Sequence, residues 1–308
     1  MQSFHLQRTQ THTVWDNSIP PVVKVAPGDE LTVEVANASG GQLGPESTVE
    51  DVARLDFSNV NPVTGPIAVE GAEPGDALVV DVIGVELQSW GWTASIPGFG
   101  LLADLFPDPH LRISDVTSKG AELLPGVFIP IAAMIGTIGV AMPEPGEHSV
   151  VPPSRYGGNM DIRHLGSGAR LWLPVGAPGA LLSLGDTHAA QGDGEICGTA
   201  IEASSQVTIH VNLEKGRALP GPQLLTDPVS TRPGPAFVTT GIGPDLYVAA
   251  LDATIAMLDE LTTHTPLSDA DAYLLVSCAG DLKVSEIVDQ PNWVVSMHIE
   301  RDLLAALV

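Results

Sequence analysis

The sequence predicts a mainly β protein. A β-sandwich or barrel-like body over residues 1–202 is expected to carry the functional site, and a smaller α+β lobe over residues 203–308 is expected to pack on it. The 308 residues include 32 glycines and 26 prolines, which favours many short strands joined by turns. Helical spacing of apolar residues is confined to about residues 244–290.

Two stretches of the body share one pattern, in which a Pro-Gly-Asp turn separates two short apolar runs. They are VVKVAPGDELTVEV and VEGAEPGDALVVDV. Such turns between alternating runs predict a pair of β-hairpins in one architecture. Residues 126–142 are apolar but broken by Pro130, Gly136 and Gly139, which favours buried strands with close backbone contacts over a helix.

The last third of the chain mixes helices and strands. Leu251, Ile255 and Leu258 recur at helical spacing after Pro244 and Asp245, which suit the first turn of a helix. Three further elements are predicted after it: a helix from Ser268 to about Cys278 that opens on a capping box, a short helix over 281–289, and a closing strand over 292–304.

Charge and composition narrow the possible partners and the compartment. The net charge of −24 repels nucleic acid and anionic membranes. The N-terminal segment lacks the apolar core of a signal peptide, and no apolar run is long enough to cross a membrane. Two cysteines, Cys197 and Cys278, exclude a disulfide framework. We therefore expect a cytoplasmic protein. A homo-oligomer, a dimer or larger, is a separate expectation that composition and charge do not decide.

The stretch LGDTHAAQGDGEICGTAIE, residues 184–202, has the strongest functional signal. In extended backbone Asp186 and His188 share one face, as do Asp193 and Glu195. A carboxylate beside an imidazole suits zinc or a similar divalent ion, and the glycines permit a tight turn between the two pairs. The alternative is a hairpin whose acids only cap turns.

Two other turns offer polar groups that can join this stretch. Gly157, Gly158 and Asn159 form a tight turn that presents Asp161, and the Asn159 amide can both donate to and accept from a substrate amide. Asp56 precedes the NPVTGP turn. For Asp56 and Asp161 the sequence leaves two roles open: capping the local turn or binding a metal.

Aromatic residues gather in SWGWTASIPGFGLLADLF, residues 89–106. This glycine-rich segment predicts a pocket wall or lid that includes Trp90, Trp92 and Phe99. The alternative is a loop whose aromatic residues pack in the core.

These motifs resemble those of the acetamidase/formamidase family, hydrolases of short amides. GDTHAAQGDGEICGTAIE is similar to the signature of that family. Further matching pieces follow the order of the family: PPVVKVAPGDELTVEV, NPVTGPIAVEGAEPGDALVVDV, WGWTASIPGFGLL, PPSRYGGNMDIRHL and, more weakly, AYLLVSCAGDLKVSEIVD. The resemblance implies hydrolysis of a small linear amide, of the formamide or acetamide type, to a carboxylate and ammonia.

The residues point to a metal-activated water for this chemistry. A Gly-x-Ser-x-Gly nucleophile elbow is absent, and Cys197 has no lysine close to it in the sequence. A divalent ion lowers the pKa of bound water from 15.7 to about 7, and a nearby carboxylate can then move the proton. The predicted metal ligands are Asp186, His188, Asp56 and Asp161; the predicted catalytic acids are Glu195 and its neighbour Asp193; and Gly158, Asn159 and Gln191 are assigned to the substrate.

Zinc is the expected metal, with calcium and manganese as alternatives. Glu195 is interpreted as the general acid/base, although it can also be a ligand or only bind loop amides. Two other functions stay open at this point: a hydrolase of a cyclic amide or imide, and a non-catalytic calcium-binding β-sandwich module. His188 argues against a pure calcium site because calcium prefers oxygen ligands.

Overall fold

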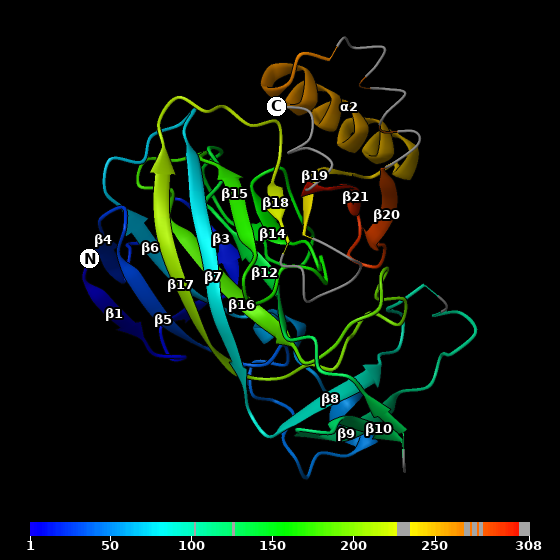
Figure 1. Ribbon diagram of the computed structural model, residues 1–308. Coiled ribbons are helices and arrows are strands. Elements are labelled where there is room, and N and C mark those ends of the chain that lie inside the picture. Colours follow the sequence, from blue (N-terminus) through cyan, green and yellow to red (C-terminus); the bar gives the residue numbers. More distant parts are fainter. Residues whose placement is uncertain are drawn as a thin grey trace.

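The computed structural model describes residues 1–101, 103–124, 127–226, 235–267, 272, 276 and 280–301. It is mainly β, as predicted, with two large sheets and one long helix (Figure 1). Within these ranges no helix is both long and apolar enough to cross a membrane.

The larger sheet has nine strands, and all of its pairings are antiparallel except that of β1 with β5. In spatial order they are β1 (Ser3–Leu6), β5 (Glu30–Val35), β17 (Ser205–Glu214), β7 (Ala77–Leu87), β15 (Arg170–Pro174), β18 (Gln223–Leu225), β19 (Ala236–Gly243), β21 (Trp293–Glu300) and β20 (Asp281–Glu286).

A second sheet of six strands carries the predicted site. Its order is β14 (Gly157–Asn159), β12 (Met134–Gly139), β16 (Leu182–His188), β6 (Val63–Val69) and β2 (Thr11–His12), with β4 (Val23–Val25) also on β6. A smaller sheet of β11 (Val127–Ile129), β10 (Gly120–Leu124), β9 (His110–Thr117) and β8 (Trp90–Ser95) projects from this body (Figure 1). The remaining short elements are β3 (Val14–Trp15), β13 (His148–Ser149), α1 (Val49–Val52) and a 3-10 turn over Phe57–Asn59.

The two large sheets bury one shared core. Val33 of β5 and Val80 of β7 belong to the same apolar cluster as Ile135 of β12 and Leu184 of β16, and all four are fully buried. Packing of side chains from two sheets is what defines a sandwich. This core fixes the end of β16, where Asp186 and His188 lie.

The two Pro-Gly-Asp turns do not form the predicted hairpins. Each turn leads from the six-stranded sheet into the nine-stranded sheet: β4 to β5, and β6 to β7. Asp29 and Asp76 close the two turns in the same way, accepting hydrogen bonds from the backbone N–H groups of Ala26 and Glu73, each at 2.9 Å. Alternating apolar residues show which face of a strand is buried, but they do not show which strand is its neighbour.

The nine-stranded sheet continues across the predicted boundary at residue 202. Strand β17, which follows that boundary, pairs with β5 on one side and β7 on the other. The later strands β18 to β21 extend the same sheet. The described part of residues 203–308 therefore completes the body as well as adding a helix to it.

Helix α2 (Leu246–His264) confirms the predicted helix after Pro244. Asp245 caps its start, accepting a hydrogen bond from the Val248 N–H at 2.9 Å. Two of the three large apolar residues at helical spacing are nevertheless exposed. Ala249, Ala253, Ala256, Met257 and Leu261 are the buried residues, whereas Leu251 and Ile255 are 44% and 52% exposed.

The reason is the close approach of α2 to β19. The Gly241 backbone faces the Ala249 carbonyl so closely that a Cβ at Gly241 would overlap it. Only small residues fit at this contact, where Ala249 and Ala253 face Gly241. Side-chain size therefore decides which face of α2 packs on β19, and the spacing of the large apolar residues does not predict that face.

Two other predictions near the C-terminus have different outcomes. The predicted short helix over 281–289 is wrong, because Asp281–Glu286 forms strand β20 beside β21. The closing strand is confirmed as β21. The predicted helix from Ser268 to Cys278 lies outside the described residues, apart from Ala272 and Val276.

The contact between α2 and β19 gives a first testable prediction. Gly241→Ala forces extra volume against backbone and should lower the free energy of unfolding by about 1–3 kcal/mol, measured by urea denaturation. Gly243→Ala is the matched control on the same strand, because nothing lies within 4 Å of an added Cβ there. Equal stability of the two variants would contradict this account of the packing.

Candidate active site

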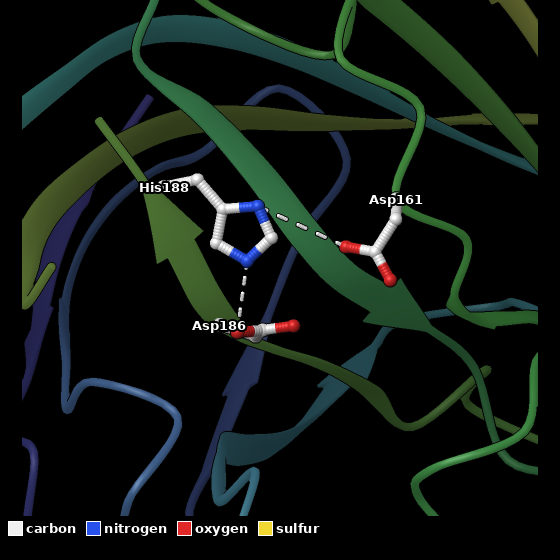
Figure 2. Close-up of side chains that lie close together, drawn as sticks. All are labelled: Asp161, Asp186 and His188. Atoms are coloured by element: carbon white, nitrogen blue, oxygen red, sulfur yellow. Dashed lines mark hydrogen bonds and ion pairs between the residues drawn. The ribbon is translucent and has the colours of Figure 1, made fainter. Parts of the chain in front are cut away.

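Asp186 and His188 meet at the end of β16, as their alternation predicts. His188 Nε2 lies 3.0 Å from Asp186 Oδ1, and both residues are buried (Figure 2). Asp161 approaches the other side of the ring, with its Oδ1 at 3.9 Å from His188 Nδ1. The fold therefore brings together three of the four predicted metal ligands, Asp161, Asp186 and His188.

Three further carboxylates complete the cluster: Glu195, Glu202 and Asp289. Ligand atoms of Asp161, Asp186 and His188 all lie within 4.8 Å of one another. The same is true of His188 with Glu195 and Glu202, and of Asp161 with Glu195 and Asp289. Five acids and one histidine thus surround one small volume.

Gly136 on β12 has no side chain, and the carboxylates of Asp161 and Asp186 occupy the space beside it. A Cβ at this position would lie 2.5 Å from Asp161 Oδ1 and 2.9 Å from Asp186 Oδ2. Any larger residue would displace one carboxylate. The predicted close backbone contact of this apolar segment is therefore part of the site.

Gln191 orients the His188 ring. Its Nε2 donates to the Asp161 carbonyl at 2.6 Å, and because a carbonyl only accepts, its Oε1 must face His188 Nδ1 at 2.8 Å. Nδ1 then carries a ring hydrogen, and Nε2 faces the carboxylates of Asp186 and Glu202. A second partner that fixes the tautomer in this way is typical of metal-binding histidines.

Several site residues hold an unusual backbone conformation. Among the described non-glycine residues, six have positive φ, and four of them are Asn61, Asp161, Asp186 and Glu195, with φ of 50°, 46°, 52° and 45°. Such conformations cost of order 1–3 kcal/mol each and persist where the surroundings enforce them, which is common at functional sites.

A network of buried polar side chains contacts Asp186 and Asp289. Asn159 Nδ2 donates to Asp289 Oδ2 at 2.5 Å, and Asn159 Oδ1 accepts from Asn61 Nδ2 at 3.0 Å and from the Thr137 hydroxyl. Thr137 Oγ1 also lies 3.3 Å from Asp186 Oδ2. The Asn159 amide, which was assigned to the substrate, is therefore engaged by protein groups and positions Asp289.

Burial of so many acids shifts their pKa values. Burial, reinforced by the charge of Asp186, raises the pKa of Asp161 well above its usual range. Burial also raises the pKa values of Glu195 and Asp289, and that of Glu202 to about 7. For His188, burial alone would lower the pKa, but the charges of Glu202 and Asp186 outweigh it and raise the pKa.

These residues fit a divalent cation. Both carboxylate oxygens of Asp161 are buried without a hydrogen-bond partner, and Glu202 Oε2, which also lacks one, lies 3.2 Å from His188 Nε2. Leaving a buried acceptor without a hydrogen bond is costly, and a bound cation would offset that cost. An imidazole nitrogen together with carboxylate oxygens is a donor set that zinc accepts.

The cluster opens into a cavity of about 190 Å³. Its polar end is formed by Asp186, Glu195, Glu202, Asn159 and Asp289. The rest of its wall is mainly apolar and includes Trp92 and Phe99, two of the three aromatic residues predicted to line a pocket. A small ligand can therefore reach the acids from one side.

The other predicted site residues lie outside the cluster. Asp56 is exposed and caps the 3-10 turn, accepting hydrogen bonds from the Ser58 N–H and hydroxyl at 3.0 and 2.7 Å. Asp193 is exposed, with its Oδ1 at 3.8 Å from Arg163 Nε. Asp193 and Glu195 do not share a face, because residues 192–198 turn where the prediction assumed extended backbone. Gly158 contributes buried backbone to β14.

Asp289 and Asn61 are functional candidates that the sequence reasoning missed. Asp289 follows β20, where Glu286 Oε1 accepts from the Asp289 N–H at 2.6 Å and bends the chain toward the cluster. Glu202 follows the turn at Gly198, and its Oε2 lies 3.2 Å from His188 Nε2. No local signal marks Asp289, since its place depends on pairing between segments distant in sequence.

Comparison with known proteins identifies similar sequences over nearly the whole chain. The sequence profile of the Acetamidase/Formamidase family matches residues 1–148 and 144–305. Formamidase from Methylophilus methylotrophus is 28% identical over 367 residues, covering 96% of this chain and 90% of that protein.

Solved structures resemble the whole fold. A predicted acetamidase/formamidase from the thermophile Thermoanaerobacter tengcongensis gives a TM-score of 0.92 at 30% identity, covering 100% of this chain and 99% of that one. Acetamidase from Bacillus halodurans gives a TM-score of 0.90 at 33% identity, covering 98% and 99%.

Proposed function

The chain belongs to the Acetamidase/Formamidase family of amide hydrolases, and we propose that it is a metal-dependent hydrolase of a small linear amide. In this reaction water adds to the amide carbonyl, the C–N bond breaks, and a carboxylate and ammonia leave. The observation that carries the proposal is the buried cluster of acids around His188 beside the cavity, in which both Asp161 carboxylate oxygens lack a hydrogen-bond partner.

Asp186, His188, Asp161 and Glu202 would hold the ion, and zinc suits this donor set best. When bound, such an ion lowers the pKa of water and polarises a carbonyl oxygen. Gln191 supports the site by fixing the His188 tautomer, and the Asn159 network supports it by holding Asp289.

Glu195 is the proposed general acid/base. It lines the cavity, and its carboxylate lies within 4.8 Å of ligand atoms of His188 and Glu202 and of Asp161 and Asp289. A carboxylate in this position can take a proton from water and deliver it to the departing nitrogen. Asp193 is a weaker candidate for the same step, because its side chain is exposed beside Arg163.

Removal of the metal gives a direct test. Dialysis against a chelator should abolish ammonia release from formamide or acetamide and lower the melting temperature, because the buried acids lose their counter-charge. Zinc, calcium and manganese would then be added back separately, and zinc is expected to restore most activity. Full activity in protein that elemental analysis shows to be free of metal would contradict the proposal.

The same assay can include cyclic substrates such as 2-pyrrolidone and succinimide. Faster turnover of a cyclic amide or imide than of any linear amide would replace the proposed substrate class but keep the reaction type. Stoichiometric calcium with no turnover of either class would instead favour a binding module.

A further inference from the structure

The apolar part of the cavity has no role in the chemistry described so far. Six of its eight apolar side chains come from two segments, residues 55–60 and 92–99, and Ala38 and Val151 supply the others. Trp92 and Ile96 are buried, whereas Phe57 is 55% exposed and lies toward solvent. This apolar part of the cavity, called the apolar wall below, therefore leads from solvent to the acid cluster.

The wall is attached directly to the cluster. Strand β8 pairs with the segment that carries Glu202: the Trp92 N–H donates to the Glu202 carbonyl at 2.9 Å, and the Glu202 N–H donates to the Trp92 carbonyl at 2.8 Å. The Thr199 hydroxyl donates to the Ala94 carbonyl at 2.8 Å. These bonds fix the distance between the apolar surface and the reacting centre.

Phe99 has a defined place in this wall. Gly198 faces its ring so closely that a Cβ at Gly198 would overlap it. The Phe99 N–H donates to the Ile96 carbonyl at 3.0 Å, which closes the turn that carries the ring. The ring is thus packed against the segment between Glu195 and Glu202.

A substrate amide must place its carbonyl and nitrogen among the polar groups. Its acyl substituent then points to the apolar wall, since the opposite end of the cavity is charged. Formamide carries only a hydrogen there and would leave the apolar surface uncovered. We propose that the wall is an acyl-binding subsite and that the preferred substrate is a primary amide with an apolar acyl group of several carbon atoms; this rests on the proposed amide hydrolysis.

The wall predicts how rate depends on acyl size. One methylene in a hydrophobic pocket changes kcat/KM by roughly 10–200-fold. Among formamide, acetamide, butyramide, isovaleramide and benzamide, kcat/KM is expected to rise at least about tenfold from acetamide to butyramide. A maximum at formamide or acetamide would overturn the inference while leaving amide hydrolysis established.

A substitution tests the residue that bounds the subsite. Phe99→Ala should lower the ratio of kcat/KM for butyramide to that for acetamide by about tenfold, because contact with the longer chain is lost. Phe106→Ala is the control: it changes the same residue type in the same segment at a position that is 61% exposed. The control should keep the wild-type ratio. An unchanged ratio in Phe99→Ala would also overturn the inference.

Binding separates this inference from the proposed function. Titration calorimetry of formamide and butyramide with Glu195→Gln protein measures affinity without turnover. Tighter binding of butyramide, with no turnover of any amide by the wild type, would keep the subsite and reject the hydrolase proposal. Equal or weaker binding of butyramide would reject the subsite whatever the turnover.

Discussion

His188→Ala is expected to remove the bound divalent ion and to reduce ammonia release by several powers of ten, to the uncatalysed level. His188 is the one nitrogen ligand among five acids in the described cluster. Its Nε2 lies 3.0 Å from Asp186 Oδ1 and 3.2 Å from Glu202 Oε2, so its loss leaves these carboxylates facing each other. The affinity for a zinc-type ion should fall, and repulsion between the acids should lower the melting temperature.

The measurement is metal content by elemental analysis beside ammonia release on the same preparation. His210→Ala is the matched control, because His210 pairs with Glu30 at 3.1 Å on the nine-stranded sheet and is absent from the cluster. The control should keep metal and activity. Stoichiometric metal in a folded His188→Ala protein would show that the ion is held elsewhere.

The sequence could predict those features of the fold that are local. Turn residues and apolar alternation were enough to give a mainly β chain, and alternation on β16 was enough to place Asp186 beside His188. Local patterns do not identify the neighbour of a strand, and for this reason the Pro-Gly-Asp turns predict hairpins although they join the two sheets.

Other errors have the same origin in tertiary contacts. The buried face of α2 is set by Gly241 on a neighbouring strand, and residues 281–286 are a strand because β21 lies beside them. In the site, Asp289 enters from the far end of the chain and Glu202 is turned inward by its bonds to Trp92. Asp56 looked equivalent to Asp161 in sequence, but it caps a surface turn.

Glu195→Gln is the second substitution for which we expect a large effect. The change keeps the shape of the side chain and removes its ability to carry a proton. If Glu195 is the general acid/base, kcat should fall by on the order of 10²–10⁴ while metal content and melting temperature stay near those of the wild type. Its buried position in a turn held by the bond from the Gly198 N–H to the Glu195 carbonyl at 2.7 Å should preserve the geometry.

Asp193→Asn is the control variant for Glu195→Gln. Asp193 is two residues away but exposed, with Arg163 as its partner at 3.8 Å, so its loss should change kcat far less than the loss of Glu195. A larger loss of kcat in Asp193→Asn than in Glu195→Gln would assign proton transfer to Asp193. Loss of metal on Glu195→Gln would make Glu195 a ligand, since its carboxylate already lies within 4.8 Å of ligand atoms of His188 and Glu202. Near-normal turnover by folded, metal-loaded Glu195→Gln protein would exclude Glu195 as the general acid/base, because the glutamine amide cannot take up and release the proton.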